Sequence, residues 1–190
     1  IFLEYHAIED SAAFAGVKEI LAERASEGVE VRVIYDDVGS IGFIDSSFIK
    51  RLEALGIRCR GFNPVVPIAN VFLNNRDHRK ICIVDGKVGF TGGYNLANEY
   101  FNLTRPYGDW KDSGVKLEGN AVHNLTMMFL EIWNATKTQG LKDASYKCYM
   151  PDIKLDRNEP GCCIQPYGDT PLDHEHVGEN VYLSIINNAD

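Results

Sequence analysis

Residues 78–95 (HRKICIVDGKVGFTGGYN) constrain the fold more than any other stretch of the chain. Ile81–Val84 are a short apolar run, which is typical of a buried strand. Asp85-Gly86 is a hairpin turn signal, after which the chain returns through residues 87–91 to Gly92-Gly93. The stretch therefore predicts a β-hairpin that ends in a glycine pair, where the backbone can approach a ligand closely.

The same stretch carries polar side chains at a defined spacing. His78 and Lys80 lie two residues apart, so on an extended strand they point to the same side. An imidazole beside a fixed positive charge suits nucleophilic attack on a phosphodiester. Asn95 follows the glycine pair and could donate a hydrogen bond to a phosphate oxygen. Asp85 lies roughly 20 Å from His78 along an extended strand, so we expect it to serve the turn rather than the imidazole.

The other segments alternate between strand and helix patterns. Strands are expected at residues 1–8, 29–35, 58–62, 110–117 and 162–167, and helices at about residues 11–27, 45–55, 119–135 and 174–188, with a short helical turn at 98–100. This order predicts an α/β fold, in which a mixed, mostly parallel β-sheet is flanked by helices on both faces. Residues 63–75 are rich in apolar side chains and are expected to pack on the core as a lid; the alternative is a rim over an acyl-chain opening.

The polar skeleton His-x-Lys, four residues, Asp, six residues, Gly-Gly-x-Asn resembles the signature of the phospholipase D superfamily. Within it, the chain most resembles bacterial cardiolipin synthases, through segments at residues 3–5, 28–36, 75–80 and 110–112 that recur in this order. The resemblance fades after about residue 135. It implies a catalytic half-domain over residues 1–135 with one His-x-Lys motif, a connector at 136–161, and at 162–190 the start of a truncated second half or a packing segment.

The resemblance also implies a reaction. His78 would form a phosphohistidine and release one alcohol, and a second alcohol would then take the phosphatidyl group, as when phosphatidylglycerol is converted to cardiolipin. Lys80 and Asn95 would stabilise the charge on the phosphate, and Gly92 and Gly93 would let it approach the backbone. Gly93 stands where many relatives carry Ser.

Two further carboxylates are candidates for the site. Asp112 could orient the imidazole of His78, and its alternative is an ordinary surface carboxylate. Glu4 lies in an apolar strand and needs a partner, which would be either the site itself or an Arg. The chemistry requires no cofactor, and no metal site is expected; His174 and His176 do not have the spacing of a helical ligand pair.

Net charge and hydrophobicity limit the classes of partner that the chain can have. The formal net charge of −8 argues against broad nucleic-acid binding, and no apolar run approaches the length of a bilayer span. The chain opens inside an apolar strand without Met, so we expect an excised, soluble piece of a longer protein. That protein would act at the cytoplasmic side of the cell membrane, attached through segments outside these residues. The partners expected are a phospholipid such as phosphatidylglycerol and a second His-x-Lys half, from the same protein or a twin subunit.

Two other functions remain open. One is a single-motif phosphodiesterase or nuclease that works as a homodimer, although the acidic balance counts against it. The other is a non-catalytic, lipid-binding relative, which the intact His78, Lys80 and Asn95 argue against.

Overall fold

The computed structural model describes the chain except for residues 65–73, 137–145, 154–162, 173 and 190. Its centre is a six-stranded sheet in the order β3-β2-β1-β4-β5-β6. The elements, in chain order, are β1 (Phe2–Tyr5), α1 (Ala12–Ser26), β2 (Arg32–Asp36), α2 (Phe48–Ala54), β3 (Arg58–Phe62), β4 (Lys80–Val84), β5 (Val88–Gly92), the 3-10 turn η1 (Asn98–Phe101), β6 (Gly114–Glu118), α3 (Ala121–Ala135), the 3-10 turn η2 (Lys147–Tyr149) and α4 (Val177–Asn187).

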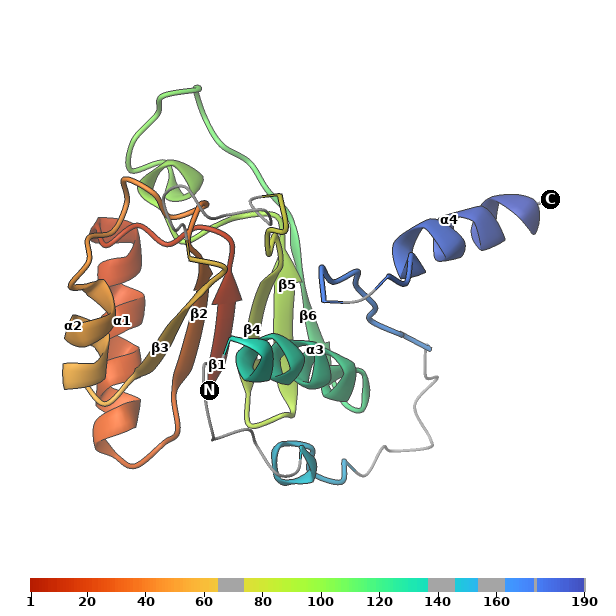
Figure 1. The fold of residues 1–190 in the computed structure, drawn as a ribbon, viewed down its shortest axis with the longest axis horizontal. Helices are drawn as coiled ribbons and strands as arrows, with labels where there is room; N and C mark the ends of the chain where they lie inside the picture. Colours follow the sequence, from red (N-terminus) through yellow and green to blue (C-terminus); the bar gives the residue numbers. More distant parts are fainter. Residues whose placement is uncertain (65–73, 137–145, 154–162, 173, 190) are drawn as a thin grey trace.

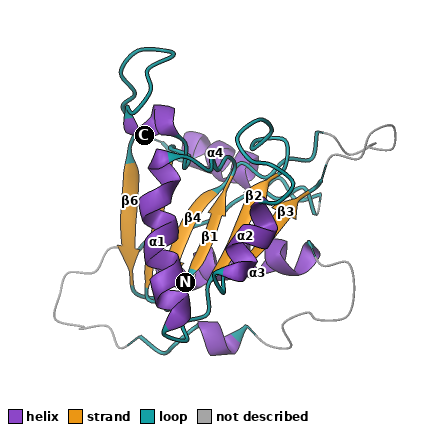
Figure 2. Cartoon of the chain, turned by 90° about the vertical axis from the view of Figure 1, so that its left-hand side faces the viewer, coloured by secondary structure: helices purple, strands orange, loops and turns teal. Residues whose placement is uncertain are grey.

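Helices cover both faces of the sheet. Figure 1 shows α1 and α2 on one side and α3 on the other, and Figure 2 looks onto the face that α1 and α2 cover. One core cluster lies under α1 and α2 and includes Phe14, Phe48 and Tyr35. The second lies under α3 and includes Phe129 and Trp133. The predicted α/β fold, with a mixed sheet between helices, is confirmed.

The share of parallel pairs is smaller than predicted. β1, β2 and β3 are parallel, but the β1–β4, β4–β5 and β5–β6 pairs are antiparallel, so "mostly parallel" is wrong. The register gives the reason: Tyr5 pairs with both Tyr35 and Lys80, so β4 begins at the end of the sheet where β1, β2 and β3 finish. From there two antiparallel connections follow. Asp85 and Gly86 make the first of them with φ values of 55° and 63°, as expected for the hairpin turn.

The start of α1 is held from outside its own sequence. The Ser11 hydroxyl makes no capping bond to this helix, although the sequence favours one. Instead the Ala13 N–H donates to Asn98 Oδ1 (3.0 Å), and the Asn98 N–H donates to Glu9 Oε2 (2.6 Å). The helix is therefore fixed to η1, which directly follows the glycine-pair end of the hairpin.

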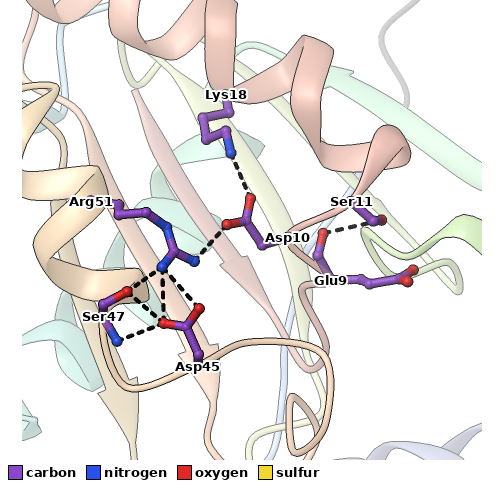
Figure 3. A network of polar contacts seen from close by, with 7 residues as sticks. All are labelled: Glu9, Asp10, Ser11, Lys18, Asp45, Ser47 and Arg51. Carbon is purple, nitrogen blue, oxygen red and sulfur yellow. Dashed lines mark hydrogen bonds and ion pairs between the residues drawn. The ribbon is translucent and has the colours of Figure 1, made fainter.

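A polar network joins α1 to α2 at the same end of the sheet. Asp10 accepts hydrogen bonds from Lys18 of α1 (2.5 Å) and from Arg51 of α2 (2.7 Å), as Figure 3 shows. Arg51 also contacts both carboxylate oxygens of Asp45, each at 2.9 Å. These contacts fix the N-terminal ends of two helices beside the loops that follow β1 and β2.

The C-terminal part departs from expectation in one respect. The strand expected at residues 162–167 is absent from its described residues, which have no regular structure. The expected helix is present as α4, and none of its residues is buried. Most of the 63–75 segment lies outside the described residues, as does much of the expected connector, and the division into half-domain, connector and second half stays a prediction. None of the described helices is long and apolar enough to cross a membrane.

Candidate active site

His78 and Lys80 face one another at the start of β4. Lys80 Nζ lies 3.1 Å from His78 Nε2 and donates a second hydrogen bond to the His78 carbonyl (2.8 Å). An ammonium can only donate, so this contact leaves the lone pair of His78 on Nε2. His78 is exposed, whereas Lys80 is buried and only 6% exposed. The imidazole Nε2 and the ammonium thus converge on one point that a ligand can reach.

The surroundings of His78 and Lys80 lower the pKa of both side chains. Partial desolvation by its neighbours, the Lys80 ammonium and His6 lower the pKa of His78 below its usual 6.5, although the residue is exposed as a whole. Burial lowers the pKa of Lys80 to about 8, against the opposing effect of the Asp77 and Asp112 carboxylates. Near neutral pH, His78 is therefore uncharged and Lys80 is protonated, which is the combination needed to attack an anionic phosphate.

A second histidine, which the sequence did not single out, lies against the first. The ring centroids of His6 and His78 are 4.7 Å apart, and their planes are tilted by 55°. His6 follows β1 directly, and its Nδ1 donates to the Asp77 carbonyl (2.8 Å). The pairing of β1 with β4 creates this neighbourhood, and nothing in the local pattern around His6 indicates it.

Asn95 lies next to the end of β1, as part of the frame of the site. Its Oδ1 accepts a hydrogen bond from the Ala7 N–H (3.1 Å), and its Nδ2 donates to the Tyr100 hydroxyl (2.8 Å). Nδ2 carries two hydrogens, so one remains beyond the bond to Tyr100. The amide therefore joins the segment after β1 to η1, and within the part of the chain that the structure describes its second Nδ2 hydrogen makes no further bond.

Asp112 lies beside Lys80 and Gly93 but does not orient the imidazole directly. Its carboxylate accepts hydrogen bonds from the Ser113 N–H (2.8 Å) and from Trp110 Nε1 (3.2 Å). Among the described residues it makes no hydrogen bond to His78. Its charge acts on Lys80 instead, where it favours the protonated ammonium. Gly92, at the end of β5, pairs with Gly114 of β6, two residues beyond Asp112.

Glu4 is paired with an arginine beneath the site, which is one of its two expected roles. Arg79 Nε lies 2.7 Å from Glu4 Oε1 and 3.3 Å from Asp77 Oδ1. Glu4 is fully buried, and both this burial and the nearby Asp77 carboxylate raise the pKa of Glu4 well above its ordinary value. Two carboxyl groups thus share one guanidinium under the backbone that carries His78, and Glu4 has no exposed surface to offer a substrate.

Asp85 lies at the other end of β4. His78 precedes this strand and Asp85 follows it, so the structure does not bring the two together. Its left-handed backbone conformation at the hairpin turn agrees with the expected structural role.

A cavity opens beside the His78–Lys80 pair. Its volume is about 540 Å³, and it lies between β6, α3 and residues 164–169. Apolar side chains form much of its wall, including Val115, Leu117, Leu125 and Met128. A phosphodiester with an apolar part could therefore reach the charged pair from this side. Within the described ranges, no group of three or more His, Cys, Asp or Glu side chains is arranged to hold a metal ion.

Comparison with known proteins places this geometry in a family. A model described as the phospholipase D-like domain of cardiolipin synthase matches residues 8–133. The chain is 43% identical over 189 residues to an uncharacterised protein of Streptococcus mutans, covering 100% of this chain and 40% of that protein. It is 33% identical over 190 residues to a cardiolipin synthase of Halalkalibacterium halodurans, and 32% identical to one of Geobacillus kaustophilus, each time over 100% of this chain and 37% of the relative. The chain therefore spans well under half the length of these relatives.

A solved structure shares the fold. Nuc, a phospholipase D family member from Salmonella typhimurium, superposes with a TM-score of 0.50 over 71% of this chain and 78% of Nuc, at 16% identity. At this identity the match shows a common architecture and nothing finer.

Proposed function

The chain belongs to the phospholipase D-like family of the cardiolipin synthases, and on this premise we propose that it transfers a phosphatidyl group between alcohols through a phosphohistidine on His78. The observation that carries the proposal is the 3.1 Å contact between Lys80 Nζ and His78 Nε2, with the imidazole exposed and next to a partly apolar cavity.

The contact supports a first step at phosphorus. When a phosphodiester binds, the ammonium moves its hydrogen bond from Nε2 to a non-bridging oxygen, which frees the lone pair. Nε2 then attacks phosphorus, the N–P bond forms, and the P–O bond to the leaving alcohol breaks. The leaving oxygen takes a proton from a general acid. In the second step another alcohol attacks phosphorus, the N–P bond breaks, and a base takes the proton of that alcohol.

The donor and acceptor that fit the family are both phosphatidylglycerol. One molecule would donate the phosphatidyl group and release glycerol, and the other would accept it to give cardiolipin. Because this lipid resides in bilayers, the proposal places the reaction at a cell membrane.

The general acid is proposed to come from a second half. The sequence contains one His-x-Lys motif, at residues 78–80, and the relatives are more than twice as long as the chain. We therefore propose that a second His-x-Lys half, in the remainder of a longer protein or in a twin subunit, faces His78 and protonates the leaving oxygen.

The test is a lipid assay with the longest protein that carries this chain. Vesicles of labelled phosphatidylglycerol should yield labelled cardiolipin on a thin-layer plate, and an alkaline quench should trap an acid-labile phosphoenzyme. His78→Ala should remove both signals. The matched control is His123→Ala, because His123 lies on α3 and bonds to the Pro151 carbonyl (3.0 Å), away from the site. Cleavage of single-stranded DNA without lipid transfer would assign the alternative phosphodiesterase function, and transfer that persists in His78→Ala would refute the nucleophile.

A further inference from the structure

His6 occupies a fixed position beside the nucleophile. Its Nδ1 donates to the Asp77 carbonyl (2.8 Å), and since a carbonyl only accepts, the hydrogen is on Nδ1. The opposite edge of the ring lies against Gly39. A methyl group there would be 2.6 Å from Cε1 and 2.7 Å from Nε2 of His6. The ring is thus held between the Gly39 backbone on one side and the Asp77–His78 segment on the other.

The hydrogen bond acts on the backbone that carries His78. Asp77 is the residue directly before His78, so fixing its carbonyl fixes the peptide plane between the two residues. The Asp77 N–H is held as well, because it donates to Asp36 Oδ2 (2.9 Å). With both peptide groups of Asp77 bonded, the backbone presents the imidazole from a defined position.

The ring of His6 then limits how the imidazole turns. His78 is exposed, and among the described residues the ring of His6 lies against it, tilted by 55° at 4.7 Å between centroids. Lys80 holds the Nε2 edge. From these contacts we infer that His6 is a positioning residue, which holds the backbone and the ring of His78 in the orientation that attack on phosphorus requires. The inference rests on the proposed phosphohistidine chemistry.

His6 also belongs to the charges that surround the nucleophile. Partial desolvation, Lys80 from β4 and His6 lower the pKa of His78, in that order, while Asp77 and Asp36 of β2 oppose them. His6 opposes a proton on His78, because like charges at this distance repel one another. Removing His6 should therefore make His78 easier to protonate, and a replacement that keeps a ring of similar size separates the loss of this charge from the loss of burial.

Two substitutions separate the contributions. His6→Phe keeps an aromatic ring and loses the donor and the ring nitrogens. His6→Asn can still donate to the Asp77 carbonyl, because its amide nitrogen takes the place of Nδ1, but it lacks the ring. We expect His6→Phe to lower kcat for phosphatidyl transfer by about tenfold or more with little change in KM, because a misplaced nucleophile slows the chemical step. His6→Asn should recover part of that loss.

The decisive readout is the protonation midpoint of His78, followed by NMR of the ring carbon Cε1 in the same protein. In both variants the midpoint should move to higher pH, and the acid limb of kcat/KM should move with it; His123→Phe should change neither. Unchanged kcat and an unchanged midpoint in a folded His6→Phe protein would overturn the inference. The NMR titration needs no turnover, so a protein without transfer activity would refute the proposed function while the midpoint still decides the role of His6.

Discussion

Gly93 leaves room for the carboxylate of Asp112. A Cβ atom on Gly93 would lie 2.3 Å from Asp112 Oδ1 and 2.8 Å from Asp112 Oδ2, so a side chain and this carboxylate cannot share the space. From the resemblance to the phospholipase D superfamily, we expect many relatives to carry Ser at this position. Here the glycine admits a negative charge next to Lys80 instead.

We expect Gly93→Ser to lower the rate of phosphatidyl transfer by about tenfold or more, because the new side chain displaces the Asp112 carboxylate from the site. The rate of cardiolipin formation measures this. The matched control is Gly16→Ala in α1, where a Cβ meets nothing within 4 Å. That change should leave transfer intact and raise the free energy of unfolding by about 0.5–1 kcal/mol. Equal activity of Gly93→Ser and wild type would show that Asp112 has no role at this position.

The pH dependence of kcat/KM should be bell-shaped. The rate rises as His78 loses its proton, and since the pKa of His78 is lowered, this limb should lie below pH 6.5. The rate falls as Lys80 loses its proton, so the second limb should lie near pH 8. Lys80→Arg tests the assignment, because a guanidinium stays protonated and the alkaline limb should vanish below pH 10 even if the rate is lower. An alkaline limb that stays near pH 8 in this variant would assign it to another group.

Asp112→Asn should move the alkaline limb to lower pH. The Asp112 carboxylate favours the protonated form of Lys80, so its removal lowers the pKa of Lys80 further. The same kcat/KM profile measures the shift. Glu118→Gln is a suitable control, because Glu118 lies at the other end of β6 and pairs with Lys116 (2.5 Å). If Asp112→Asn lowers the rate without moving the limb, Asp112 acts by a route other than the charge on Lys80.

The buried Glu4–Arg79–Asp77 cluster should make stability depend on pH. The pKa of Glu4 is raised well above 4.5 in the folded protein, so the folded state holds this proton more tightly than the unfolded state. The stabilisation is complete below pH 4.5 and is lost as the pH rises toward the folded pKa. Urea unfolding at several pH values should show this decline in the free energy of unfolding, and Glu4→Gln should abolish it.

Arg79→Met should lower the free energy of unfolding far more than Glu4→Gln does. It leaves Glu4 and Asp77, which are 0% and 2% exposed, without their shared cation, a loss that costs about 3–5 kcal/mol in buried ion pairs. The double variant Glu4→Gln with Arg79→Met should recover part of the loss, because one buried acid is then gone. Strict additivity of the two single changes, measured by urea unfolding at pH 7, would argue against the coupled cluster.

Local patterns predicted most individual elements. β3 was expected at residues 58–62 and lies there, and the 119–135 pattern gave α3 to within two residues at its start. These signals are short-range: apolar periodicity, a glycine after α1, and the Asp85-Gly86 turn. Strand direction is not a local property. The antiparallel entry of β4 depends on where the chain stands after β3, and the local pattern does not encode this.

In the candidate site, too, local motifs predicted some residues, whereas others depend on strand pairing. His78, Lys80 and Asn95 could be named in advance because one motif carries them, and simple strand geometry separated Asp85 from the imidazole. His6 could not be found, because its neighbourhood arises only when β1 pairs with β4. Glu4 showed its need for a partner, but the choice of Arg79 likewise waits on that pairing.

The central place of β1 has a kinetic consequence. One neighbour, β2, follows closely in the sequence, whereas the other, β4, pairs Phe2 with Ile83 from a distant part of the sequence. His6 follows β1 and His78 precedes β4, so the two rings come into contact only when these strands pair. This pairing requires the closure of a long loop, which is slow. A ribosome-bound or refolding chain would thus form the β4–β5 hairpin early and the contact between His6 and His78 late. A protein halted between those stages would contain the His-x-Lys motif but lack the contact of its imidazole with His6.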